Sequence, residues 1–194
     1  MISDIETVKK YLLRLQDQIC SALEEEDGAA RFNAGAGGLA RPRVLSQGSV
    51  FERAAVNFSH SVGGRLPTAA SDQLSQLKGA PFEAVSLSLI VHPLNPYVPT
   101  AHANLRYFVV TGETEHPAWW FGGGFDLTPY YGFKEDAVHW HQMARAACVP
   151  FGKDVYRRYK EACDRYFYLP HRGEARGIGG LFFDDLNEGG FERC

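Results

Sequence analysis

Extended segments follow one another along this chain without a helix between each pair, and this order constrains the fold more than any other feature. Segments with alternating or continuous apolar character cover residues 44–59, 85–92, 102–111, 119–125 and 177–185. Such short apolar segments are typical of β-strands. Strands that come in runs favour an antiparallel sheet, whereas strict strand–helix alternation favours a parallel one. We therefore expect an α+β fold built on a large antiparallel sheet.

Helical periodicity is found in three stretches, residues 4–23, 135–148 and 154–167. In each of them apolar residues recur at spacings of three and four, as on one face of an α-helix. The Gly-rich stretches 29–43 and 63–81 are expected to be loops, the second with a short helical turn near Leu74. The expected core residues of the first extended segment are Phe51, Val56 and Phe58.

Composition excludes several classes of protein. The formal net charge is −3, so the chain lacks the basic field that attracts nucleic acid. It contains no apolar run of the roughly 18 residues that a membrane span needs, and its first residues do not resemble a secretory signal. Four widely spaced cysteines suggest reduced thiols and a cytoplasmic protein. Aromatic residues make up 13 % of the chain, which suits either a filled core or a large flat ligand.

A stiff connection links two of the expected strands. Pro93, Pro96 and Pro99 interrupt regular pairing between His92 and His102, because proline lacks the N–H that a sheet requires. If this connection folds back, the two histidines can approach each other. Such a rigid link suits a site that must keep its geometry.

The strand after this connection carries a row of polar residues. His102, Asn104 and Arg106 alternate with Ala103 and Leu105, so the polar three are expected to project from one face. An acid–base group, an amide and a permanent cation on one face suit an anionic substrate, because arginine binds carboxylates with a two-pronged fork.

Two glycine-rich segments add further candidates. Asp126 follows three consecutive glycines among aromatic residues, where its charge is costly without a partner. We expect N–H donors of a ligand to be that partner, although a turn cap is an alternative. Arg176 precedes a second glycine-rich segment and could hold another substrate carboxylate. The adjacent Asp184 and Asp185 are expected to make turn or salt-bridge contacts rather than act as a catalytic pair.

Four histidines could bind a divalent metal if the fold brings them together: His92, His102, His141 and His171. His139 and His141 lie about 200° apart around a helix axis, and His141 shares a small apolar face that would pack inward. The spacing of the four matches no compact metal motif, so structural roles for these histidines stay open.

The residues quoted above resemble the family of oxygen-dependent coproporphyrinogen oxidases. The similarity is carried by Val91-His92-Pro93, Asn95–Thr100, His102-Ala103-Asn104, Trp119–Pro129, His139-Trp140-His141 and Arg176–Leu186. The resemblance implies that two propionates of coproporphyrinogen III are decarboxylated to vinyl groups, giving protoporphyrinogen IX. It also implies O2 as electron acceptor, no organic cofactor, a divalent cation such as Mn²⁺ as a candidate metal, and a homodimer with a sheet flanked by helices on both sides.

The resemblance also implies roles for individual residues. His102 corresponds to the proton donor, and the substrate-binding positions correspond to Ser88, Asn104, Leu105 and Arg106, with Leu105 acting at most through its backbone. The proposed metal ligands correspond to His92, His102, His141 and His171. Asp126 would accept N–H bonds from pyrroles, and Arg176 would join Arg106 in neutralising carboxylates.

Members of this family are longer than 194 residues, so the resemblance implies one domain, residues 1–194, that lacks its C-terminal part. An antiparallel sheet that loses strands gains an open edge, and we expect the chain alone to be poorly soluble or inactive. Two other functions stay open. One is a metal-dependent oxygenase or hydrolase that uses the four histidines, and the other is a non-catalytic tetrapyrrole-binding fragment.

Overall fold

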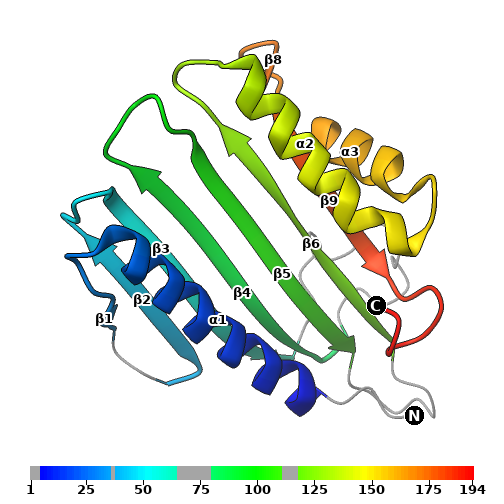
Figure 1. Cartoon of the computed structure of the whole chain (residues 1–194). Helices are drawn as coiled ribbons and strands as arrows, with labels where there is room; N and C mark the ends of the chain where they lie inside the picture. Colours follow the sequence, from blue (N-terminus) through cyan, green and yellow to red (C-terminus); the bar gives the residue numbers. More distant parts are fainter. Residues whose placement is uncertain (1–4, 36–37, 65–79, 111–117) are drawn as a thin grey trace.

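The computed structural model describes residues 5–35, 38–64, 80–110 and 118–194, and its central feature is a seven-stranded sheet (Figure 1). All neighbouring strands are antiparallel, in the order β1-β2-β3-β4-β5-β6-β9. The strands are β1 Asn33–Ala34, β2 Ala40–Ser46, β3 Phe51–Gly63, β4 Phe82–Pro93, β5 Thr100–Val110, β6 Trp119–Thr128 and β9 Gly179–Leu186. A separate hairpin consists of β7 Tyr168–Leu169 and β8 Glu174–Ala175. The expected antiparallel α+β class is confirmed.

The helices are α1 Ile5–Asp27, α2 Lys134–Cys148 and α3 Val155–Tyr166, with a 3₁₀ turn at Val149–Phe151. Figure 1 shows α1 and α2 in front of the same side of the sheet, which we call the helical face. No helix among the described residues combines the length and the apolar character that crossing a membrane requires.

Helix α3 lies along the edge strand β9 rather than over the middle of the sheet. Tyr159 stacks on Phe183 and Tyr166 stacks on Phe182. Phe182 and Phe183 are neighbours on a strand and so point to opposite faces, which means that α3 reaches both faces at this edge. We expected helices on both sides. In the described part of the chain, α1 and α2 share one face, and α3 shields an edge that would otherwise offer unpaired backbone groups.

The main core lies between α1 and the helical face. Val56 on β3, Val85 on β4 and Tyr107 on β5 are fully buried beneath the apolar side of α1. Gln16 of α1 is also buried, and its amide donates hydrogen bonds of 2.7 Å to the carbonyls of Arg41 and Val56. These two bonds attach α1 to β2 and β3 and satisfy the amide N–H groups of Gln16, which burial would otherwise leave costly.

Most elements match the expectations from sequence, and the differences have a physical reason. Strand β2 begins at Ala40, inside a stretch that was expected to be a loop. β3 offers a backbone partner for every residue of Ala40–Ser46, and such pairing can override weak local propensity. Phe51, Val56 and Phe58 are buried as expected. The helical turn expected near Leu74 lies outside the described residues.

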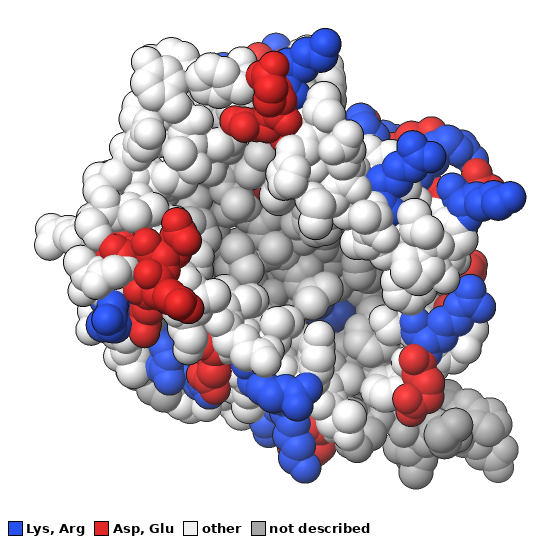
Figure 2. Space-filling view, in the orientation of Figure 1, with Lys and Arg blue, Asp and Glu red and all other residues white. Residues whose placement is uncertain are grey.

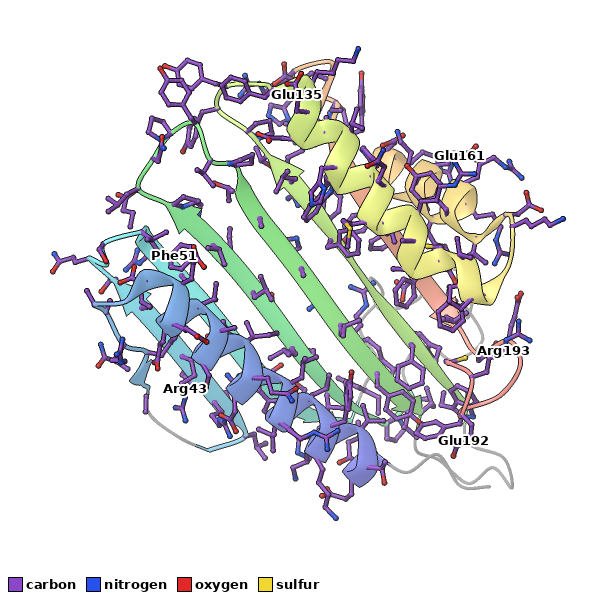
Figure 3. All side chains as sticks on the ribbon, in the orientation of Figure 1. Arg43, Phe51, Glu135, Glu161, Glu192 and Arg193 are labelled. Carbon is purple, nitrogen blue, oxygen red and sulfur yellow. The ribbon has the colours of Figure 1, made fainter. Side chains whose placement is uncertain are left out.

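The helical face is hollowed between α1 and α2, and charged side chains surround the hollow (Figure 2). A cavity of about 470 Å³ on this face has Ala103, Leu105 and Phe125 in its floor. It lies towards the C-terminal end of α2, where Arg193 also lines it. Glu135, near the start of α2, marks the opposite end of that helix (Figure 3).

Candidate active site

Strand β5 directs its polar residues away from α1 and α2, onto the side of the sheet that we call the polar face. His102, Asn104 and Arg106 all line one cavity of about 500 Å³. The side chain of Leu105 points to the helical face, where it is 38 % exposed in the other cavity. The expected alternation along this strand is therefore confirmed.

Asp126 on β6 lies at the centre of the polar site, and its side chain is only 1 % exposed. It is the register partner of His102, and Asp126 Oδ1 lies 2.8 Å from His102 Nδ1. Arg176 donates from Nη2 to Oδ1 over 2.8 Å and from Nε to Oδ2 over 3.0 Å. A two-pronged pair with arginine offsets much of the cost of burying a carboxylate. Asp126 thus fixes the His102 ring so that Nε2 is the nitrogen that faces away from it.

Phe167, directly after α3, packs against both partners of Asp126. The guanidinium carbon of Arg176 lies 3.9 Å from the centroid of the Phe167 ring, a cation–π contact. The His102 ring meets the same phenyl ring edge-on, with 6.0 Å between centroids. The backbone N–H of Arg176 also donates to the Phe167 carbonyl over 3.2 Å. Phe167 therefore restricts the movement of both side chains that contact Asp126.

Glycine allows β9 to approach β6 closely beside Asp126. Gly180 is the register partner of Asp126, and a Cβ atom at this position would lie 2.0 Å from the carbonyl oxygen of Phe125. Because no side chain fits at this distance, another residue at position 180 would push β9 away from the strand that carries the buried carboxylate.

Arg106 is held by a second carboxylate, that of Asp184 on β9. Arg106 Nη2 lies 2.6 Å from Asp184 Oδ2. Gly122 lies between them: a Cβ there would come within 2.3 Å of Asp184 Oδ1 and 2.6 Å of Arg106 Nε. The β6–β9 register shifts at this point, and Asp185 takes a positive φ of 55°. A bulge of this kind can re-aim a side chain beside an active site, and here it accompanies the expected salt-bridge role of Asp184.

Aromatic side chains form one wall of the 500 Å³ cavity: Tyr166, Phe167, Tyr168 and Phe182. The rings of Tyr166 and Phe182 are stacked, with 4.0 Å between centroids. A smaller cavity of about 270 Å³ on the polar face shares His102 and Arg176 with the 500 Å³ cavity, and His92 and Thr100 also line it. The approach of His92 and His102 that the proline connection suggested is therefore confirmed by their shared cavity.

Ser88 lies on the polar face beside these residues. It is the register partner of Asn104 across β4 and β5, and the Asn104 amide donates to the Leu87 carbonyl over 3.4 Å. The fold thus brings Ser88, Asn104 and Arg106 onto one surface. Whether each of them binds a substrate stays a prediction.

The four histidines expected as metal ligands do not converge in the described part of the chain. His92 and His102 share a cavity, but His171 is exposed in the β7–β8 turn. His141 Nε2 lies 2.9 Å from the Ile178 carbonyl, and its Nδ1 lies 3.1 Å from the Tyr156 hydroxyl. Among residues 5–35, 38–64, 80–110 and 118–194, no three His, Cys, Asp or Glu side chains are grouped to hold a metal ion. The donor set described here does not fit the expected cation.

Cys163 lies beneath the site, and its thiol is expected to be unreactive. Burial, together with the nearby charge of Asp126, raises the pKa of its thiol to about 12. A thiol with this pKa stays protonated near neutral pH, so it lacks the thiolate that nucleophilic catalysis requires. All four cysteines are free, in agreement with the expected reduced thiols.

Sequence reasoning missed part of the site. It recognised an excess of aromatic residues but did not assign Tyr166, Phe167 or Phe182 to the cavity. These three come from the end of a helix and from an edge strand, which no local pattern connects. It also assigned the partner of Asp126 to a ligand, whereas Arg176, which lies 50 positions further along the chain, pairs with it.

A comparison with known protein families agrees with this geometry. The model of the family described as coproporphyrinogen III oxidase matches residues 7–194. The match covers nearly the whole chain, including the strands and loops that carry His102, Asp126 and Arg176. The chain therefore belongs to the coproporphyrinogen III oxidase family, a family of oxidoreductases in porphyrin biosynthesis.

Proposed function

We propose that this protein oxidatively decarboxylates two propionate groups of coproporphyrinogen III to vinyl groups, with O2 as the electron acceptor. In each step a –CH2–CH2–COOH group and O2 become –CH=CH2, CO2 and H2O2. The carbon–carbon bond to the carboxyl group breaks, and the two hydrogen atoms lost from the side chain reduce O2 to H2O2. The observation that carries this proposal is the cluster of His102, Asp126 and Arg176 beside a cavity that also contains Arg106.

Arg106 is the proposed anchor for a substrate carboxylate. Its hydrogen bond to Asp184 uses Nη2, and a guanidinium carries five N–H donors in total. A propionate can therefore bind to Arg106 while Asp184 keeps the side chain in place. Ser88 and Asn104 lie on the same face of the sheet as Arg106, and they are proposed to orient the substrate.

His102 is the proposed proton-transfer group. When its Nδ1–H is donated to Asp126, Nε2 can accept a proton from the substrate and return it later. Asp126 is proposed to orient His102 rather than to contact the pyrroles itself, because it is buried and its oxygens already accept bonds from His102 and Arg176. This differs from the role expected from sequence, in which Asp126 receives pyrrole N–H groups.

The aromatic wall of the cavity suits a large ring system. Tyr166 and Phe182 offer a stacked apolar surface, and Phe167 covers Arg176. A porphyrinogen is electron-rich and can react with O2 directly, so the proposal needs no organic cofactor. The protein would supply orientation, charge neutralisation and exclusion of water. No step is assigned to a metal. Homodimerisation and a cytoplasmic location stay predictions from the family resemblance.

Turnover of coproporphyrinogen III under air tests the proposal. Consumption of O2, release of CO2 and formation of the divinyl product, which chromatography of the oxidised porphyrins detects, would support the proposal and would contradict the expectation that the chain alone is inactive. His102→Ala should lower kcat by about 10²–10⁴-fold, the usual range for general acid–base groups. His139→Ala is the matched control, because His139 is an exposed histidine on α2.

Binding measured beside turnover separates the alternatives. Quenching of Trp fluorescence by coproporphyrin without any release of CO2 would support a non-catalytic tetrapyrrole-binding chain. Full activity of His102→Ala would rule out His102 as the proton-transfer group. Activity that appears only with added metal would favour the metal-dependent oxygenase.

A further inference from the structure

The segment from Arg176 to Gly180 places Arg176 on Asp126 and then enters β9. Its backbone is fixed to β6, because the Ile178 N–H donates to the Leu127 carbonyl over 3.0 Å. Gly177 and Gly179 have φ values of 65° and 73°, a left-handed conformation that glycine adopts without strain. At Gly177 a Cβ would also lie 2.2 Å from the Leu127 oxygen. The segment therefore has one tightly defined path, which we call the arginine turn (residues 176–180).

Helix α2 holds this turn from the helical side. Two consecutive residues of the helix bond to two consecutive carbonyls of the turn. Trp140 Nε1 donates to the Gly179 oxygen over 3.0 Å, and His141 Nε2 lies 2.9 Å from the Ile178 oxygen. The Trp140 ring also meets Phe125 of β6 edge-on, with 5.1 Å between centroids. The turn is thus bonded to β6 on one side and to α2 on the other.

The hydrogen-bonding pattern defines the state of the His141 ring. A carbonyl oxygen can only accept, so Nε2 must carry the proton that is donated to Ile178. In the neutral ring Nδ1 is then an acceptor, and the Tyr156 hydroxyl of α3 lies 3.1 Å from it. Both ring nitrogens are engaged, one by a carbonyl and one by a hydroxyl.

We propose that His141, supported by Trp140 and Tyr156, is a positioning residue that fixes the arginine turn and thereby keeps Arg176 on Asp126, and that it is not a metal ligand. The two roles exclude each other at His141 Nε2. A metal ligand needs a free lone pair on a ring nitrogen, whereas this nitrogen carries a proton and donates it. Binding a metal through Nδ1 would require displacement of Tyr156.

The position of α2 in the fold supports the same assignment. α2 packs on the helical face through Ala144 and Cys148, whereas His92 and His102 line a cavity on the polar face. A metal shared by all three histidines would have to bridge the sheet or draw α2 away from its packing. The positioning role of His141 requires no such movement, because its hydrogen bonds are already present.

Hydrogen exchange of the arginine turn, with His139→Phe as control, tests the proposal. His141→Phe removes both hydrogen bonds while keeping an aromatic ring, and we expect the Ile178 amide to exchange about tenfold faster, as loss of one or two hydrogen bonds implies. His139→Phe makes the same chemical change two positions away on an exposed side chain, and exchange should not change. Tyr156→Phe should give a smaller increase, since it removes only the support of the ring.

A conservative variant distinguishes a positioning role of His141 from a metal-ligand role. Glutamine at position 141 can still donate its amide N–H to the Ile178 oxygen, so His141→Gln should keep exchange close to that of the unmodified protein. His141→Gln has no ring nitrogen, so a metal-ligand role for His141 predicts weaker Mn²⁺ binding in this variant as well as in His141→Phe. Titration with Mn²⁺ alone, followed by calorimetry, should give the same result for the unmodified protein, His141→Phe and His139→Phe.

Either of two results would overturn the positioning role of His141. One is unchanged exchange at Ile178 in His141→Phe. The other is loss of Mn²⁺ binding in both His141 variants while His139→Phe still binds it. Neither measurement uses turnover, so the outcome does not depend on whether the proposed decarboxylation is correct.

Discussion

Charge pairs position the ionised side chains on the polar face. Arg106 is positioned by Asp184, and the absence of a side chain at Gly122 makes room for both. Both partners are about a quarter exposed, so the pair is screened by solvent less than a surface ion pair but is not fully desolvated. This arrangement keeps a flexible arginine pointing in one direction before a substrate arrives.

Removal of the Asp184 carboxylate should therefore affect substrate binding more than chemistry. We expect Asp184→Ala to raise KM about tenfold, because a hydrogen bond to a charged group contributes about 1.5–3 kcal/mol, while kcat changes less than about twofold. Steady-state kinetics with coproporphyrinogen III measures both constants. Asp154→Ala is the control, since Asp154 pairs with Arg157 on the exposed surface of α3. A fall in kcat at constant KM would contradict this role.

At this scale, sequence reasoning identifies candidates well but pairs them poorly. Strand alternation is a local rule, so it places His102, Asn104 and Arg106 on one face correctly. The high cost of an unpaired buried carboxylate correctly indicated that Asp126 needs a partner. The identity of that partner, Arg176, depends on how β9 pairs with β6, and no local pattern contains that information.

At the scale of elements, the contact between α1 and the β2–β3 turn depends on one buried carboxylate. Asp27, the last residue of α1, accepts backbone hydrogen bonds from Ala30 over 2.8 Å and from Val50 and Phe51 over 3.0 Å each. These bonds hold the Asp27 pKa well below its usual range, with the bond from Ala30 as the largest cause. An acidic residue is normally unfavourable at a helix C-terminus, so its presence here indicates that the bonds across to the turn outweigh the helix dipole.

The sign of the pKa shift predicts how stability depends on pH. Because the folded pKa lies below the unfolded value of 3.8, Asp27 contributes stability above about pH 4 and loses it as the pH falls further. Asp27→Asn replaces one accepting oxygen with a donor that opposes backbone N–H groups. Urea unfolding should show that the variant is less stable at pH 7 and that the difference narrows at pH 3. A constant difference at both pH values would mean that charge is not involved.

Elements with strong periodicity are predictable, and those formed by pairing are less so. The three helices follow the expected apolar spacing closely. Helix α1 nevertheless extends to Asp27 through Glu24, Glu25 and Glu26, where the apolar spacing ends but helix propensity stays high. β2 contains Pro42 and Arg residues that suit a loop, and it becomes a strand because β3, and β1 over two residues, supply partners.

At the scale of the whole molecule, the sheet separates packing from chemistry. The helical face carries α1, α2 and the main core, and the polar face carries the charged site. Bonds from α2 to the arginine turn connect the two sides at the β9 edge. The antiparallel class was predictable because the strands come in runs. The gathering of α1 and α2 on one face was not, because periodicity shows which side of a helix is apolar but not which face of a sheet it covers.

The strand order also has a consequence for the time course of folding. β1 to β6 are neighbours in the order in which they occur in the chain, whereas β9 joins β6 only after a long excursion through the helices. Contacts between distant parts of a chain carry a larger loop-closure entropy and tend to form later. We therefore expect the meander to form while Asp126 still lacks Arg176, so that its burial is completed by the last strand to dock. Pulsed hydrogen exchange during refolding should protect amides of β4 and β5 before those of β9, and simultaneous protection would show that the sheet assembles in one step.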